Sequence, residues 1–135
     1  MSKVFVVPDV HLKPWMFEEA SNLIKSVRCD RIVLLGDLVD DWFCEKEYDL
    51  YAETLRKAKI FIREHNALLC WGNHDLSYKW EALESGYSPS ARSVVLKGLY
   101  ELEEAVRKRI VPISTGSIIR CFRMAVSHLR LLRIS

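Results

Sequence analysis

Three short apolar runs recur in the first half of the chain, and each ends abruptly in a proline or glycine followed by polar residues. The runs are KVFVV at residues 3–7, RIVLL at 31–35 and ALLCW at 67–71, closed by Pro8, Gly36 and Gly72. Short apolar segments rich in β-branched residues and bounded by turn formers are typical of buried β-strands. We therefore predict three buried strands at these positions.

Helical periodicity separates the three runs. Between the first two, apolar residues recur every three or four positions, at Phe17, Ala20, Ile24 and Val27. This spacing predicts a helix with Pro14 in its first turn. A longer helix is predicted over about residues 45–64, ending at Asn66. Strand, helix, strand, helix, strand is typical of a parallel, doubly wound α/β sheet.

The second half of the chain is less regular. A short helix is expected within residues 75–86, followed by a turn-rich loop at 86–93. Ser93 is a candidate cap for a further helix whose apolar face holds Val95, Leu99, Leu102 and Val106. Beyond this helix, β-like runs at 110–113, 118–122 and 124–126 predict short strands.

Composition limits the class of protein. With 135 residues, 50% of them hydrophobic and 28% charged, the chain suits one globular domain and excludes a disordered polymer. No apolar run approaches the ~18 residues that cross a bilayer, so we expect a cytoplasmic protein without membrane contact. The four cysteines have no CxxC spacing, which argues against a zinc knuckle or a redox dithiol.

Charge is unevenly distributed along the chain. Residues 107–135 carry seven Lys and Arg and no Asp or Glu, although the whole chain has a net charge of only +2. Clustered basic residues bind phosphates, so nucleic-acid binding stays open as an alternative. An incidental basic tail explains the same pattern.

A polar cluster follows each predicted strand. The clusters are Asp9-Val10-His11, Gly36-Asp37-Leu38-Val39-Asp40 and Gly72-Asn73-His74-Asp75, with 28 residues from Asp9 to Asp37 and 36 from Asp37 to Asn73. Each interval is about one βαβ unit, so all three clusters should meet at the carboxyl edge of the sheet. Carboxylates this close together repel one another, and bound cations would relieve that repulsion. Carboxylate, imidazole and amide ligands suit Mn²⁺, Fe²⁺ or Zn²⁺.

The ordered motifs D-x-H, G-D-x-x-D and G-N-H-D, each behind a strand, resemble those of the calcineurin-like metallophosphoesterase superfamily. The resemblance covers residues 3–75 and extends to Ser127-His128. It implies an α/β sandwich with a parallel βαβαβ core and C-terminal β strands. It also implies hydrolysis of phosphomonoesters or phosphodiesters at a site holding two divalent metal ions (Mn, Fe or Zn).

The resemblance assigns a role to each matching position. Asp9 and His11 would bind one metal, Asn73 and His128 the other, and Asp37 would bridge both. His74 would act as proton donor or phosphate contact, with Asp40 orienting its imidazole. Asp75 is expected to brace its loop.

Four of these residues have a plainer alternative. Asp9 and His11 could belong to a polar loop, Asp40 could start a helix, and His128 could be a core or surface histidine. The four tryptophans are interpreted as core or rim aromatics, with a place in a substrate cleft left open for Trp42.

Two departures from the family pattern bear on activity. The chain has no G-H-x-H motif, and its four histidines include no candidate for the two missing ligands. We therefore expect a metallophosphoesterase domain at residues 1–128 with incomplete C-terminal strands, and a basic tail at 129–135 of uncertain native relevance. Activity of the truncated chain would be impaired. In addition, Asp41 stands where protein Ser/Thr phosphatases of the superfamily carry a phosphate-binding arginine.

Three functions therefore remain in view from the sequence. The first is a phosphoesterase and the second is a nuclease of the same superfamily. The third is a non-catalytic remnant or nucleic-acid-binding module. The sequence leaves the substrate and the oligomeric state open.

Overall fold

Three parallel strands form the centre of the fold, which the computed structural model describes over residues 3–111. The strands are β1 (Val4–Val7), β2 (Arg31–Leu34) and β3 (Leu68–Leu69), hydrogen-bonded in the order β1-β2-β3. Val4 pairs with Arg31, and Val33 pairs with Leu68. The predicted parallel βαβαβ core of an α/β fold is confirmed.

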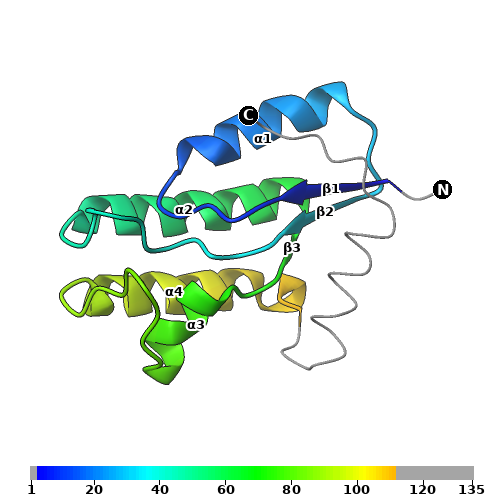
Figure 1. The fold of residues 1–135 in the computed structure, drawn as a ribbon. Helices are drawn as coiled ribbons and strands as arrows, with labels where there is room; N and C mark the ends of the chain where they lie inside the picture. The colour runs from blue at the N-terminus through cyan, green and yellow to red at the C-terminus, as the bar shows by residue number, and fades with distance from the viewer. Residues whose placement is uncertain (1–2, 112–135) are drawn as a thin grey trace.

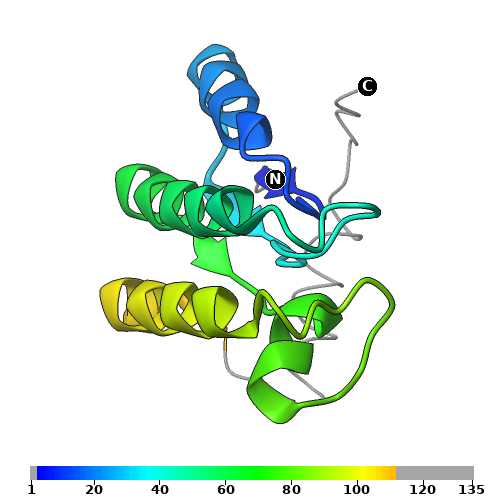
Figure 2. The same cartoon turned by 90° about the vertical axis from the view of Figure 1, so that its left-hand side faces the viewer.

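The helices are α1 (Trp15–Ser26), α2 (Tyr48–His65), α3 (Asn73–Trp80) and α4 (Arg92–Val106), with a short 3-10 turn at Arg107–Arg109. Figures 1 and 2 show α1, α2 and α4 on one side of the strands, with α2 and α4 side by side. Because the strand order never reverses, right-handed crossovers bring both connecting helices to the same face. Within residues 3–111 the helices therefore do not form the second layer of a doubly wound sheet.

The sheet continues beyond β3 at its outer edge. Ile110 forms a parallel bridge with Leu69, and the Val111 N–H donates to the Leu69 carbonyl at 2.8 Å. The run predicted at 110–113 thus begins to pair as expected. The runs predicted at 118–122 and 124–126 lie outside the described residues.

Two helix starts differ from the prediction. Helix α2 begins at Tyr48, after a loop, and its last residue is His65. Asn66, which was predicted to stop the helix, caps it in the left-handed conformation. Helix α4 begins at Arg92, so Ser93 lies inside the helix and does not cap it. Ser88 takes part of that role, because its hydroxyl accepts the Ala91 N–H at 3.2 Å.

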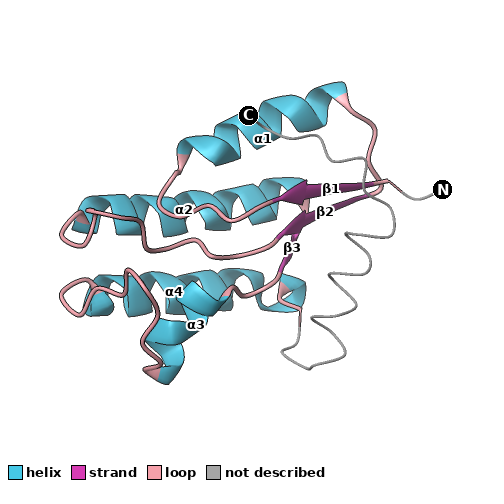
Figure 3. Ribbon diagram, in the orientation of Figure 1, coloured by secondary structure: helices cyan, strands magenta, loops and turns pink. Residues whose placement is uncertain are grey.

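The core lies between the sheet and the helix layer. Figure 3 distinguishes the strands of the sheet from the helices by colour. Alternate residues of β1, Phe5 and Val7, are buried, as are Ala20 of α1 and Phe61 of α2. Burial of this face anchors the strands, so the loops at their carboxyl ends start from rigid positions. No helix within residues 3–111 is long and apolar enough to span a bilayer.

Candidate functional site

The first two predicted clusters are joined through backbone hydrogen bonds. The N–H groups of Val10 and His11 both donate to the Asp37 carbonyl, at 3.1 and 2.8 Å, and Leu12 N–H donates to the Leu38 carbonyl at 3.0 Å. These bonds hold the loop after β1 against the loop after β2. The strand ends therefore bring together residues that are far apart in the sequence.

Two glycines allow the loops after β2 and β3 to touch. A Cβ atom on Gly36 would lie 2.3 Å from the Gly72 nitrogen, and one on Gly72 would lie 2.1 Å from the Asp37 Oδ1. Gly36 also has a φ of +80°, which residues with side chains rarely adopt. Both positions need glycine because backbone and a carboxylate occupy the space of a side chain.

Asp9, His11 and Asp37 form a cluster of possible metal ligands. Each residue offers one ligand atom, and these atoms all lie within 4.8 Å of one another. The His11 Nδ1 lies 2.9 Å from the Asp40 carbonyl oxygen, which can only accept, so Nδ1 donates this hydrogen bond and Nε2 is the ring nitrogen left for a metal. Two carboxylates and an imidazole oriented in this way fit a mid-row divalent cation.

Backbone strain accompanies this cluster. His11, Asp37 and Asp40 have φ values of 42°, 45° and 66°, in the left-handed region. Strain of this kind persists only where surrounding contacts hold it, and it concentrates at functional sites.

Asp40 and His74 form a second group beside the cluster. The His74 Nδ1 lies 3.2 Å from the Asp40 Oδ2, and its ring stands edge-on to that of His11 with centroids 5.0 Å apart. Asp40 also accepts hydrogen bonds from the hydroxyls of Tyr51 and Tyr78. Burial raises the pKa of Asp40, although the hydrogen bonds from Tyr78 and His74 act in the opposite direction.

The two tyrosine contacts were not predicted. The sequence analysis predicted a helix around Tyr51 and a short helix around Tyr78, but it singled out neither residue for the site. Helical periodicity reports which side of a helix is buried, but it does not report which polar atom a tyrosine hydroxyl reaches.

Asp75 braces two loops, as the sequence predicted. Its carboxylate is fully buried and accepts the N–H groups of Leu38 at 2.8 Å and Gly72 at 3.1 Å. Burial raises the pKa of Asp75 to about 7, with a further upward contribution from the charge of Asp37.

Of the two remaining predicted ligands, Asn73 and His128, the structure describes only Asn73. Asn73 is exposed at the first position of α3, directly beside His74, whose backbone N–H donates to the Asp37 Oδ1 at 2.9 Å. His128 lies outside the described residues.

A pocket of about 180 Å³ opens next to His11 and His74. Its other lining residues are Lys13, Asp40, Asp41, Trp42, Ser85 and Gly86. Lys13 was missed by the sequence reasoning; the pattern that could have found it is its position two residues after His11, in the same polar loop.

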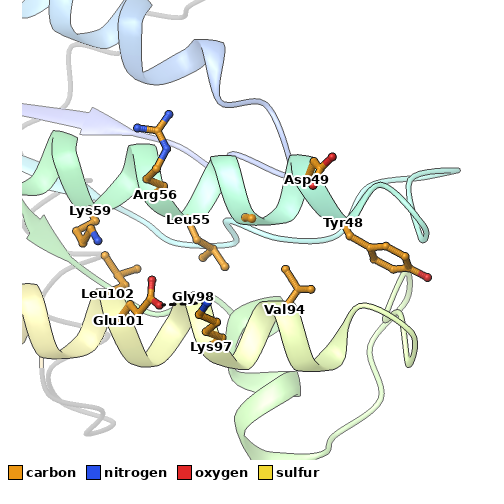
Figure 4. A pocket seen from close by; sticks show the side chains of 11 residues that line it. Tyr48, Asp49, Leu55, Arg56, Lys59, Val94, Lys97, Gly98, Glu101 and Leu102 are labelled. Carbon is orange, nitrogen blue, oxygen red and sulfur yellow. Dashed lines mark ion pairs between the residues drawn. The ribbon is translucent and has the colours of Figure 1, made fainter.

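A second hollow, of about 290 Å³, lies between α2 and α4 (Figure 4). Leu55 and Leu102 form apolar parts of its wall, and Lys97 and Glu101 form an ion pair at its edge with N and O 3.9 Å apart. Of the predicted site residues that the structure describes, none lines this hollow.

Comparison with known proteins agrees with this geometry. A family model described as calcineurin-like phosphoesterase matches residues 2–125. Searches of curated proteins and of solved structures give no significant match. The family match spans nearly the whole chain, and the D-x-H, G-D-x-x-D and G-N-H-D motifs form neighbouring loops at the carboxyl edge of its sheet. The chain therefore belongs to the calcineurin-like phosphoesterase family of metal-dependent phosphoesterases.

Proposed function

We propose that this chain hydrolyses phosphomonoesters or phosphodiesters at a dinuclear metal site. The observation that carries the proposal is the convergence of Asp9, His11 and Asp37, whose ligand atoms lie within 4.8 Å of one another. Unpaired carboxylates at this distance repel each other, and divalent cations remove that repulsion. Mn, Fe and Zn ions are the candidates because the ligands are carboxylate and imidazole.

The proposed ligand sets follow the order of the loops. Asp9 and His11 would hold one ion, Asn73 and His128 would hold the other, and Asp37 would be shared between them. Divalent ions held by these residues would activate water and neutralise the charge that grows on the phosphoryl oxygens.

His74 is the proposed proton donor to the leaving-group oxygen. Its Nδ1 lies within hydrogen-bond distance of Asp40, so Nε2 is the nitrogen that can serve the substrate. His74 also lines the pocket beside the cluster. A positioned general acid contributes about 10²–10⁴ in rate, which is the loss expected for His74→Ala.

Hydrolysis of p-nitrophenyl phosphate with added Mn²⁺ tests the proposal. We expect turnover by the wild-type chain that EDTA abolishes and that Asp37→Asn lowers at least about 100-fold. Asp49→Asn is the matched control, because Asp49 is exposed in the first turn of α2 and lies outside the cluster. No metal-dependent turnover by the wild type would refute the catalytic proposal.

The same preparation separates the two alternative functions. A nuclease would cleave single- or double-stranded DNA with Mn²⁺, and Asp37→Asn would abolish the cleavage. A nucleic-acid-binding module would instead show salt-dependent affinity that survives Asp37→Asn.

A further inference from the structure

One exposed aromatic side chain, Trp42, stands at the pocket that His11 and His74 line, and a second, Phe43, follows it in the sequence. Trp42 is 71% exposed and lines this pocket, and Phe43 is 93% exposed. Phe43 also has a φ of 64°, a conformation that bulky residues rarely adopt. Aromatic side chains ordinarily contribute most when buried, so the exposure of this pair is not explained by the packing of the fold.

Asp41 connects this aromatic rim to a positive charge. Its Oδ1 accepts the Trp42 N–H at 2.8 Å, and its Oδ2 accepts the Lys13 ammonium at 3.0 Å. Lys13 donates in addition to the His11 carbonyl at 3.1 Å. One carboxylate thus contacts both the backbone N–H of Trp42 and the ammonium of Lys13, and all three residues line the pocket.

Among the residues of the described part of the chain, 3–111, Lys13 is the only Lys or Arg that lines this pocket. The neighbouring side chains include the carboxylates of Asp40 and Asp41, which would repel a phosphate group. An ammonium fixed by two hydrogen bonds offers the entering anion an attractive partner.

On the basis of the proposed phosphoester hydrolysis, we propose that Trp42 selects phosphoesters that carry a planar aromatic ring, a nucleotide being the simplest example, while Lys13 contacts the phosphate. An indole stacks on any base because every base presents a π face. A sugar phosphate or alkyl phosphate has no such face, so it gains only the contact with Lys13.

Titration calorimetry with adenosine monophosphate and ribose 5-phosphate tests this proposal, because the two ligands share the phosphate and differ in the base. In the presence of Mn²⁺, we expect adenosine monophosphate to bind the wild type more tightly than ribose 5-phosphate does. Trp42→Ala should weaken nucleotide binding about 5- to 150-fold and leave ribose 5-phosphate binding unchanged. Where the nucleotide is turned over, KM replaces the dissociation constant.

Three further variants distinguish stacking from a general effect on the site. Trp42→Phe keeps a π face and should retain most of the preference for the nucleotide. Trp80→Ala is the matched control, because Trp80 is 61% exposed at the end of α3 and does not line the pocket. Lys13→Gln should lower the affinity for both ligands by a similar factor.

The outcome is separable from that of the proposed hydrolysis. Tight nucleotide binding that depends on Trp42 supports this proposal even if the chain hydrolyses nothing. Equal affinity for the two ligands, no binding of adenosine monophosphate, or a Trp42→Ala variant that keeps the preference would each overturn it.

Discussion

The carboxylate of Asp40 accepts hydrogen bonds from three other side chains. Two tyrosine hydroxyls and the His74 ring nitrogen lie around one buried side chain. A carboxylate that accepts from Nδ1 keeps the proton on that nitrogen, which fixes the tautomer and the orientation of the imidazole. Asp40 is therefore a positioning residue that acts through His74.

We predict that Asp40→Asn lowers kcat about 100-fold with a smaller effect on KM, because the amide can favour the wrong tautomer of His74. Steady-state kinetics on p-nitrophenyl phosphate provide the measurement. In a His74→Ala background the same change should have little further effect on kcat. Equal losses in both backgrounds would show that Asp40 does not act through His74.

Asp75 makes a prediction about pH in the metal-free protein. Burial raises its pKa from 3.8 to about 7, so the folded state holds a proton that the unfolded state has already lost in this interval. The stability contributed by this group is therefore present below pH 3.8 and declines as the pH rises toward about 7. Urea unfolding of the EDTA-treated wild type and of Asp75→Asn should show this decline only in the wild type. Parallel pH dependence in the two proteins would contradict the prediction.

At the scale of elements, α2 and α4 meet closely at one glycine. A Cβ atom on Gly98 would lie 2.5 Å from the Leu55 Cδ1 and 3.1 Å from the Leu55 Cβ. Leu55 is buried in the core, and its Cβ is fixed to the α2 backbone, so rotation of the side chain cannot relieve the contact at 3.1 Å. The labels of Gly98 and Leu55 in Figure 4 mark this contact beside the hollow between the helices.

We predict that Gly98→Ala does not stabilise the protein, as a change from glycine to alanine in a helix ordinarily would, but destabilises it by up to about 2 kcal/mol. Alanine improves helix propensity by ~1 kcal/mol, but overpacking against Leu55 costs about 1–3 kcal/mol. Urea denaturation measures the change. Since the loss comes from one contact, Gly98→Ala combined with Leu55→Ala should be less destabilising than the sum of the two single changes. Simple additivity would place the cause elsewhere.

The same scale explains what the sequence could predict. The three strands were found because β-branched runs closed by Pro8, Gly36 and Gly72 carry a local signal. Their convergence followed from the geometry of parallel sheets. The predictions of where α2 starts and which residue caps α4 were wrong because loop residues 44–47 and Ser88 depend on partners that are distant in the sequence. The Ser88 hydroxyl, for example, donates to the Glu45 carbonyl at 2.6 Å. Lys13, Tyr51 and Tyr78 were missed for the same reason.

For the whole molecule, the candidate metal cluster joins the site to the stability of the fold. The loops after β1 and β2, which both contain left-handed residues, meet the first turn of α3 at Asp37, and the charge of Asp37 helps to raise the pKa of Asp75. Without cations these like charges oppose folding, and with cations the same side chains become attractive. Whether removing one of these charges raises or lowers the stability of the protein should therefore depend on whether metal is bound.

We predict that Asp37→Asn is at least as stable as the wild type in EDTA and less stable than the wild type in Mn²⁺. The amide oxygen can still accept the His74 N–H, so removing the charge lowers repulsion at little structural cost. In Mn²⁺ at about 100 times the dissociation constant, the wild type should gain ~2.7 kcal/mol of stability, and the variant much less. Thermal unfolding with and without Mn²⁺ measures both effects, with Asp49→Asn expected to respond as the wild type does. Equal Mn²⁺ stabilisation of wild type and Asp37→Asn would mean that the ions bind somewhere other than this cluster, and the proposed centre would have to be abandoned.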